Sequence, residues 1–257
     1  HDRMRPDVNG NGTYDQIVKN LQYCVAHRNG EEYYVRGTFT RYNLDFTTDV
    51  EDMLDHGFPA VSMEPVVGED TESYSIKEED LPRVKEEYDR LAKLFIRREE
   101  AGRPFFFFHF NMDLWKGPCL PKRLRGCGAG HEYLAVVPNG DIYPCHQFVG
   151  REGYVLGNVY EGLKNMKMMH DFRTNHVFTK PECVDCWAKF FCSGGCHANN
   201  EAFAGDIHKP YHITCEIQKK RVECAMMIQA YNQLKKPRVM AQPGSFEAKR
   251  EAQEKLQ

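Results

Sequence analysis

Hydrophobic and polar positions in the N-terminal part of the chain alternate between helical and strand patterns. Residues 13–28 carry apolar side chains at helical spacing, and Thr13 is the predicted N-cap of this helix. A strand over 33–39, a short helix that ends at Gly57, and a second strand over 58–63 follow. The pattern therefore repeats a helix–strand unit.

A third unit completes this region. Apolar residues at helical spacing predict a long helix over 81–95, closed by Gly102, and the run 105–110 is almost continuously apolar. Such a run is typical of a parallel strand buried on both faces. Three such units predict an α/β fold, a parallel sheet or barrel with helices outside. Because three parallel strands leave faces and edges open, we expect the second half of a larger barrel.

The remainder of the chain has a different pattern. Residues 111–234 contain short strand patterns, turns such as 138–141, and most of the cysteines, and they end in a predicted helix over about 214–234. Residues 235–257 are polar and charged, as in a solvated terminus. The predicted domains are therefore residues 1–110, residues 111–234 and the tail.

The composition argues against several classes of protein. The chain has 257 residues, with 34 basic and 37 acidic side chains and a net charge of −3. Without a basic field or a run of basic residues, we expect no nucleic-acid partner. No apolar run reaches the roughly 18–20 residues of a membrane helix, and the features of a signal peptide are missing. We therefore expect no membrane span and a cytoplasmic location.

Cysteine is the residue type that departs most from average. Eight of the ten cysteines lie within residues 119–215. The close pair Cys183-x2-Cys186 can reach one metal centre from a tight turn, and thiolates suit iron–sulfur clusters and zinc. Eight thiols suffice for two four-cysteine sites, whereas a simple zinc ribbon normally shows two close pairs. Cys24 and Cys224 fall at helical spacing, and we expect them to be buried hydrophobic cysteines.

The order of the cysteines and several longer segments resemble a known family. The order is Cys127-x12-Gly140-x4-Cys145, then Cys183-x2-Cys186-x5-Cys192-x3-Cys196, then Cys215. It resembles the SPASM domain, which carries two auxiliary [4Fe-4S] clusters in radical SAM peptide-modifying enzymes. GPCLPKRLRGCGAGHEYLAVVPNGDIYPCHQFVG and CVDCWAKFFCSGGCHANN are most similar to the maturases that form thioethers in six-cysteine SCIFF peptides. HDRMRP, GNGTYD, VRGTFTRYN and SMEPVVG resemble the latter half of the radical SAM barrel, so the resemblance covers about residues 1–232.

The resemblance implies ligands for both clusters. The outer cluster, auxiliary II, is matched by Cys183, Cys186, Cys192 and Cys215. Auxiliary I, nearer the active site, is matched by Cys127, Cys145 and Cys196. Cys119 stands where some SPASM enzymes have a fourth ligand, whereas the SCIFF maturases keep this position open for a substrate cysteine, and both alternatives remain. His146 and His197, next to ligands, either tune a cluster or only pack locally.

The resemblance also implies the architecture: the C-terminal half of a partial radical SAM (β/α)6 barrel, followed by a small α+β SPASM domain with two Fe-S clusters. Radical SAM enzymes bind their catalytic cluster through Cys-x3-Cys-x2-Cys near the start of the barrel, and this motif is missing from the 257 residues. The missing motif and the missing strands together predict the C-terminal part of a longer enzyme. We expect this part to be inactive without its partner, the N-terminal half of the barrel.

For the full-length enzyme, the resemblance implies SAM and a third [4Fe-4S] cluster as cofactors. Reductive cleavage of SAM would yield a 5′-deoxyadenosyl radical, and the product would be cysteine-to-α-carbon thioether cross-links in a cysteine-rich precursor peptide. Arg36, Thr38 and Asn43 are candidates for the SAM side of the barrel, because barrel sites lie at strand ends, or they are packing and surface residues. Two alternatives remain: a SPASM maturase that forms a different cross-link, and a non-catalytic zinc-binding interaction module.

Overall fold

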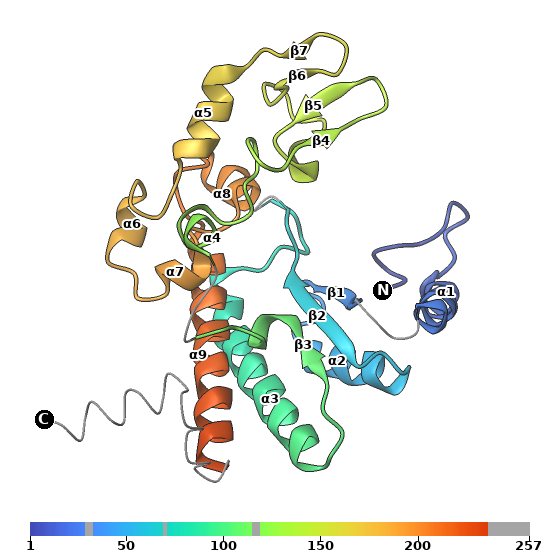
Figure 1. The fold of residues 1–257 in the computed structure, drawn as a ribbon. Coiled ribbons are helices and arrows are strands. Elements are labelled where there is room, and N and C mark those ends of the chain that lie inside the picture. Colours follow the sequence, from blue (N-terminus) through green and yellow to red (C-terminus); the bar gives the residue numbers. More distant parts are fainter. Residues whose placement is uncertain (29–32, 69–70, 115–118, 236–257) are drawn as a thin grey trace, which may run out of the picture.

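The computed structural model describes residues 1–28, 33–68, 71–114 and 119–235, so the predicted tail lies outside the described residues from residue 236 onward (Figure 1). The described chain forms a parallel sheet with long helices, and a second region of short helices and strands. The predicted α/β class is confirmed. None of the helices in these ranges has the length and apolar composition needed to cross a membrane.

The first region consists of alternating helices and strands. Its elements are, in chain order, α1 (Tyr14–His27), β1 (Val35–Phe39), α2 (Phe46–Asp55), β2 (Ala60–Pro65), the 3-10 helix η1 (Glu78–Asp80), α3 (Leu81–Glu100), β3 (Phe106–Phe107) and the 3-10 helix η2 (Phe108–Phe110). The strands pair in the order β1-β2-β3, and both pairs are parallel. A helix lies in each connection between neighbouring strands, as parallel pairing requires. The predicted helix–strand units are therefore confirmed.

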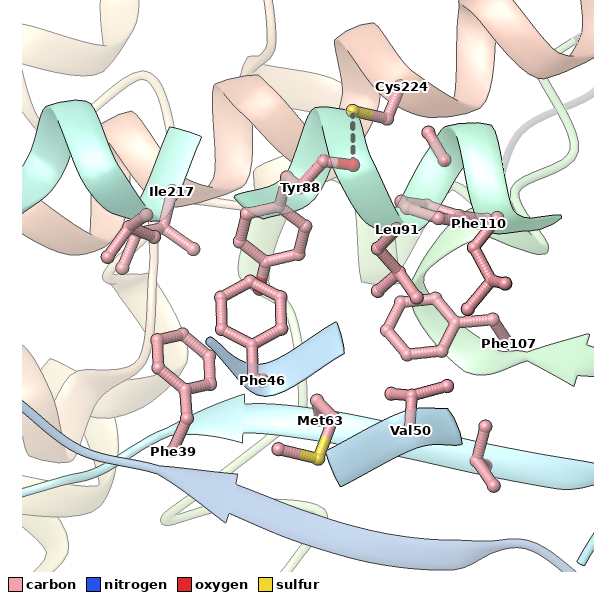
Figure 2. Packing of buried hydrophobic residues seen from close by; sticks show 14 of the residues in the cluster. Phe39, Phe46, Val50, Met63, Tyr88, Leu91, Phe107, Phe110, Ile217 and Cys224 are labelled. Atoms are coloured by element: carbon pink, nitrogen blue, oxygen red, sulfur yellow. Dashed lines mark hydrogen bonds between the residues drawn. The ribbon is translucent and has the colours of Figure 1, made fainter. Parts of the chain in front are cut away.

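The core of this region lies between the sheet and its helices (Figure 2). Phe39 of β1 stacks on Phe46 of α2 with 4.4 Å between ring centroids, and Phe46 lies 4.8 Å from the ring of Tyr88 on α3. Met63 and Phe107 from the other two strands are equally buried. Side chains at every second strand position thus face the helices, and the intervening positions face the opposite side of the sheet.

The run 105–110 does not form the fully buried strand that its apolar composition predicts. Only Phe106 and Phe107 belong to β3, and η2 follows at once. Phe107 is buried, whereas Phe106 and Phe108 are 38% and 46% exposed. The prediction is wrong because β3 is an edge strand of the described sheet, where it pairs only with β2, and the side chain of Phe106 stays partly exposed.

Two predictions about α1 also need correction. Thr13 occupies the N-cap position, but its side chain caps nothing, since its hydroxyl donates to the carbonyl of Arg5. The carboxylate of Asp2 takes this role and accepts hydrogen bonds from the N–H groups of Thr13 and Tyr14, each at 2.8 Å. Cys24 is exposed on the outer side of the helix, whereas Cys224 is buried as predicted.

The second region contains a small antiparallel sheet and several short helices. Its elements are α4 (Leu120–Arg125), β4 (Ala135–Val136), β5 (Asp141–Tyr143), the 3-10 helix η3 (His146–Phe148), β6 (Gly157–Asn158), β7 (Gly162–Leu163), α5 (Met166–Thr174), α6 (Pro181–Val184), α7 (Lys189–Cys192), α8 (His197–Ala204) and α9 (His212–Lys235). The strand order is β4-β5-β6-β7. Phe148 and Phe172 are the largest fully buried side chains of a separate small core, which also contains Cys145.

The long helix α9 connects the two regions. It begins in the cysteine-rich part of the chain and runs alongside α3 (Figure 1). Ile217 and Cys224 of α9 belong to the core of the first region, and the thiol of Cys224 donates to the carbonyl of Tyr88 at 3.6 Å (Figure 2). The predicted domain boundaries remain a prediction, but the last helix of the second region packs on the first.

Candidate functional site

Seven cysteines of the second region divide into two groups, and within each group the thiols raise the pKa of their neighbours. The inner group consists of Cys127, Cys145 and Cys196. The outer group consists of Cys183, Cys186, Cys192 and Cys215. This division coincides with the one that the family resemblance implies for the two clusters. Cys119, an exposed residue at the N-cap of α4, precedes both groups.

Burial is the main influence on the thiols. It raises the pKa of Cys145, and the neighbouring Cys196 and Cys127 raise it further. In the outer group, burial and then the three other thiols raise the pKa of Cys215 to about 12. Like charges at close range disfavour ionisation, so the thiols of one group cannot all become anionic without a cation among them.

Backbone N–H groups point at three of the sulfurs. Cys192 accepts from Gly194 and Gly195. Cys196 is the N-cap residue of α8 and accepts from Ala198 and Asn199, whose N–H groups have no partner within the helix. In the same way Cys145 accepts from Gln147 and Phe148 at the start of η3. These hydrogen bonds lower the thiol pKa and favour the thiolate form, which is the form that binds metals.

A turn of unusual backbone conformation joins the two groups. Ser193, Gly194 and Gly195 have φ values of +62°, +83° and +78°, in the left-handed region. This turn carries the chain from Cys192 of the outer group to Cys196 of the inner group within three residues. Gly194 and Gly195 make this left-handed backbone conformation accessible, since a residue with a Cβ atom is strained at positive φ.

Lys180 fills the space beneath this turn. Its side chain is completely buried, and its ammonium group donates to the carbonyl of Gly194 at 2.7 Å. A Cβ atom on Gly194 would lie 3.2 Å from Nζ of Lys180. Burial lowers the pKa of Lys180, while Cys183, Cys192, Cys215 and Cys196 raise it. A buried cation therefore lies among thiols of both groups.

The two histidines next to predicted ligands are in different surroundings. His146 is exposed, and its Nδ1 lies 2.9 Å from the hydroxyl of Tyr133. His197 is buried, and its Nδ1 lies 3.3 Å from Asn175. Burial and the charge of Lys180 lower the pKa of His197 to about 4, so it is neutral at physiological pH. Its Nε2 is buried without a hydrogen-bond partner in the described residues.

A cavity of about 200 Å³ lies between the thiols and the first region. Cys192 and Cys196 line one side, and Glu64 of β2 and Arg221 of α9 line another. Asn199 also lines it, and its Oδ1 is buried without a partner in the described residues. Burial alone would raise the pKa of Glu64, but the hydrogen bond from His109 and the charge of Arg221 outweigh it and lower the pKa to about 2. The cavity therefore has thiols on one side and a fixed carboxylate on the other.

The three candidates for a SAM contact lie near the end of β1, but not at one cavity. Thr38 and Asn43 help to line a cavity of about 560 Å³ between α1, β1 and α2, and Arg36 is not among its lining residues. Asn43 accepts from Thr40 and donates to Asp49, so its side chain holds the turn after the strand. Arg36 and Thr38 are exposed on the side of β1 opposite Phe39.

The thiol groups fit an iron–sulfur cluster. In the described ranges, no three His, Cys, Asp or Glu side chains lie close enough to hold a single metal ion. A cubane cluster binds each thiolate to a different iron atom, so its sulfur ligands lie farther apart than those around one zinc ion. The outer group offers four thiols in buried or half-buried positions. The inner group offers three thiols, and backbone N–H groups donate to two of them, Cys145 and Cys196.

Comparison with known proteins supports this assignment. Residues 127–187 match the family model of SPASM, an iron–sulfur cluster-binding domain. The chain resembles radical SAM/SPASM enzymes. It superposes on two structures of native anSMEcpe, one with bound AdoMet and Cp18Cys peptide (TM-score 0.65, 17% identity) and one with bound AdoMet and Kp18Cys peptide (TM-score 0.65, 18% identity).

The superpositions cover 91% of this chain but only 67% and 66% of the two anSMEcpe chains. A third structure, native anSMEcpe with bound AdoMet, has a TM-score of 0.62 at 16% identity and is covered to 63%. The comparison with curated proteins gave no match. At this level of identity the likeness concerns the fold alone, and the expected fold class, an α/β region followed by a SPASM region, is confirmed at that level.

Several residues of the site carry no signal in the sequence. Glu64, His109 and Arg221 come together only in the fold. Glu64 lies in the segment SMEPVVG, but that segment does not indicate its two partners. Lys180 lies three residues before Cys183, which does not distinguish it from any surface lysine. The one available signal was Gly194-Gly195 between two predicted ligands, since paired glycines indicate a backbone conformation that other residues rarely adopt.

Proposed function

We propose that this chain is the auxiliary-cluster part of a radical SAM peptide-modifying enzyme. The observation that carries the proposal is the division of seven thiols into two groups. Four of the seven, Cys127, Cys145, Cys183 and Cys186, lie within the residues 127–187 that match the SPASM model. The inner group would hold auxiliary I, and the outer group would hold auxiliary II. The anSMEcpe structures with bound AdoMet and peptide support the same class of substrate.

The cofactors supply the radical chemistry when bound, because SAM and its cluster generate the radical that abstracts hydrogen from the peptide. This chain's own residues hold the auxiliary clusters, exclude water and position the peptide. The inner group has three thiols, and the exposed Cys119 is not needed to complete it if a peptide thiol takes the fourth position. The cavity between Cys196 and Glu64 offers space for a peptide side chain at that position.

We further propose that the product is a thioether between cysteine and an α-carbon of a cysteine-rich precursor peptide. Formation of this bond removes the S–H hydrogen and one C–H hydrogen from the peptide. The full-length enzyme would catalyse it, with Arg36, Thr38 and Asn43 on the SAM side of the barrel. The proposal rests on the similarity of the two cysteine segments to thioether-forming maturases and on an inner group of three thiols that does not include Cys119.

Metal analysis after anaerobic reconstitution tests the cluster assignment. We expect about eight iron atoms per chain, in two [4Fe-4S] clusters. Cys183→Ala should lose about half of the iron, because it removes a ligand of the outer cluster only. Cys24→Ala is the matched control, since Cys24 is an exposed cysteine outside both groups. Stoichiometric zinc with negligible iron would refute the proposal and favour a zinc-binding interaction module.

Mass spectrometry of the peptide product tests the reaction. The full-length enzyme with SAM, a reductant and a cysteine-rich peptide should release methionine and 5′-deoxyadenosine, and the peptide should lose two hydrogens per cross-link. Alkylation of the free thiols separates the possible products, because a thioether consumes a thiol and a carbon–carbon link leaves it free. A product with all its thiols intact would contradict the thioether proposal while leaving the wider family assignment in place.

A further inference from the structure

Lys180 is a buried cation without a carboxylate partner among the described residues. It stands immediately before α6 and is 0% exposed, and its ammonium group donates to the carbonyl of Gly194. By comparison, the buried Arg221 is paired with Glu64 at 3.1 Å, and the buried Lys220 is paired with Asp89 at 2.7 Å. Lys180 is therefore an exception among the buried cations of this protein.

Burying an ammonium group away from water is costly unless an anion compensates it. The carbonyl of Gly194 contributes a dipole but no charge. Lys180 contacts the outer group at two points: its carbonyl accepts from the N–H of Cys183 at 2.9 Å, and its ammonium group lies against the turn that follows Cys192. An iron-loaded cluster on the outer thiols would therefore be the anion that compensates this charge.

The surrounding backbone is shaped to admit this cation. The left-handed turn 193–195 arches over the ammonium group, and Gly194 leaves the space that a Cβ atom would fill at 3.2 Å from Nζ. Asn200 also donates to the carbonyl of Gly194, at 3.3 Å, and holds this carbonyl in place. A strained turn, a missing side chain and a second donor thus all support one buried lysine.

We propose that Lys180 is the counter-charge of the outer cluster and raises its reduction potential. The inference rests on the proposed function, because it requires a cluster on the outer thiols. A cluster gains negative charge when it accepts an electron, so a fixed positive charge nearby stabilises the reduced form more than the oxidised form. Within a buried site this attraction is weakly screened. Lys180 is buried beneath the turn 193–195, and it would act through the cluster as a tuning residue.

Redox titration of the full-length, iron-loaded protein, followed by electron paramagnetic resonance, tests the inference. Lys180→Met removes the charge and keeps an unbranched side chain of similar length. We expect the outer cluster to become harder to reduce, with at least a tenfold lower ratio of reduced to oxidised cluster at a fixed potential. For a one-electron couple this is a shift of about 59 mV to more negative potential.

Lys189→Met is the matched control. Lys189 lies on α7 between two outer ligands, and its ammonium group also donates to a backbone carbonyl, that of Val184, but it is only half-buried. Solvent screens its charge, so the potential of the outer cluster should change much less. An iron-loaded Lys180→Met protein with an unchanged potential, or an equal shift in both variants, would overturn the inference.

Two further variants cover the case in which Lys180→Met loses the outer cluster. Lys180→Gln keeps a donor for Gly194 without the charge, and Lys180→Arg keeps the charge. Loss of iron in both neutral variants and retention in the arginine variant would support a counter-charge. Loss in the arginine variant as well would show that the shape of lysine matters, and would overturn the inference. Wild-type protein without iron is a different result, because it would refute the proposed function itself.

Discussion

Arg221 of α9 donates a hydrogen bond to Glu64 near the end of β2, with 3.1 Å between Nη2 and Oε2. Arg221 also donates to the hydroxyl of Tyr88 at 2.8 Å and to the carbonyl of Met63 at 2.9 Å. Glu64 in turn accepts from Nε2 of His109 at 2.9 Å. Since α9 starts in the cysteine-rich region and β2 belongs to the parallel sheet, this network ties the two regions together at the wall of the cavity beside Cys196.

Arg221→Met should destabilise the protein strongly. The variant removes a buried guanidinium that pairs with the half-buried carboxylate of Glu64 and donates to Tyr88 and Met63, and breaking a buried pair costs roughly 3–5 kcal/mol. Lys219→Met, two residues earlier on α9, breaks a half-exposed pair with Glu216 at i, i+3 and should cost at most about 1 kcal/mol. Chemical denaturation of both variants measures the difference in the free energy of unfolding. Equal small losses would show that the Arg221–Glu64 pair does not hold the regions together.

Acidification should destabilise the protein through His109. Burial and the charge of Arg221 lower the pKa of His109 from 6.5 to about 4. Between these values the unfolded chain binds a proton that the folded chain does not bind. The free energy of unfolding therefore falls as the pH drops from about 6.5 to about 4, by roughly 3 kcal/mol in total.

Glu64 adds a second loss at lower pH. Its folded pKa of about 2 lies below the usual 4.5, so the stability that it contributes is present above pH 4.5 and disappears as the pH falls toward 2. Thermal unfolding of the wild type and of His109→Gln at matched iron content separates the two effects. The variant should lack the loss between about pH 6.5 and 4, whereas His27→Gln, on the exposed end of α1, should follow the wild type. Parallel curves for all three proteins would contradict the assignment.

The helices α1, α2, α3 and α9 and the first two strands could be predicted because their apolar residues repeat at helical or strand spacing. The short β3 could not, because its apolar run is compatible with a strand, a helical turn or an exposed edge. Burial on one side depends on which elements lie next to the strand, and local sequence does not contain this information. The cap of α1 likewise depends on Asp2, eleven residues before the N–H group of Thr13 that it accepts from.

The same distinction applies to the candidate site. The two thiol groups could be predicted because the order and spacing of the cysteines resemble a family pattern. Arg221 and Glu64 are 157 residues apart, and their contact exists only because α9 returns to the sheet. Lys180 has ordinary sequence surroundings, and its role depends on complete burial beneath the turn 193–195.

Gly194→Ala should disturb the site more than its backbone strain alone explains. At positive φ a Cβ atom costs roughly 1–2 kcal/mol, and here it would also press on Lys180 at 3.2 Å. Gly205→Ala is the control, because Gly205 also has a positive φ, +69°, and no atom within 4 Å of a new Cβ. We expect lower stability in both variants, and a changed outer-cluster spectrum only in Gly194→Ala. Unchanged spectra in both would indicate that Lys180 can move away at no cost to the cluster.

Cys119 decides whether the inner group is open to a peptide thiol. Cys119 is exposed at the start of α4, outside both thiol groups, whereas Cys127 belongs to the inner group. In the full-length enzyme, Cys119→Ala should therefore keep about eight iron atoms and substantial thioether formation, and Cys127→Ala should lose the inner cluster. Iron analysis and electron paramagnetic resonance, each with and without peptide, measure both effects. The spectrum of the inner cluster should change when peptide is added to the wild type and to Cys119→Ala.

If Cys119→Ala alters the iron content or the spectrum without peptide, Cys119 is the fourth ligand. A peptide thiol then does not coordinate the inner cluster, whose role would be confined to electron transfer.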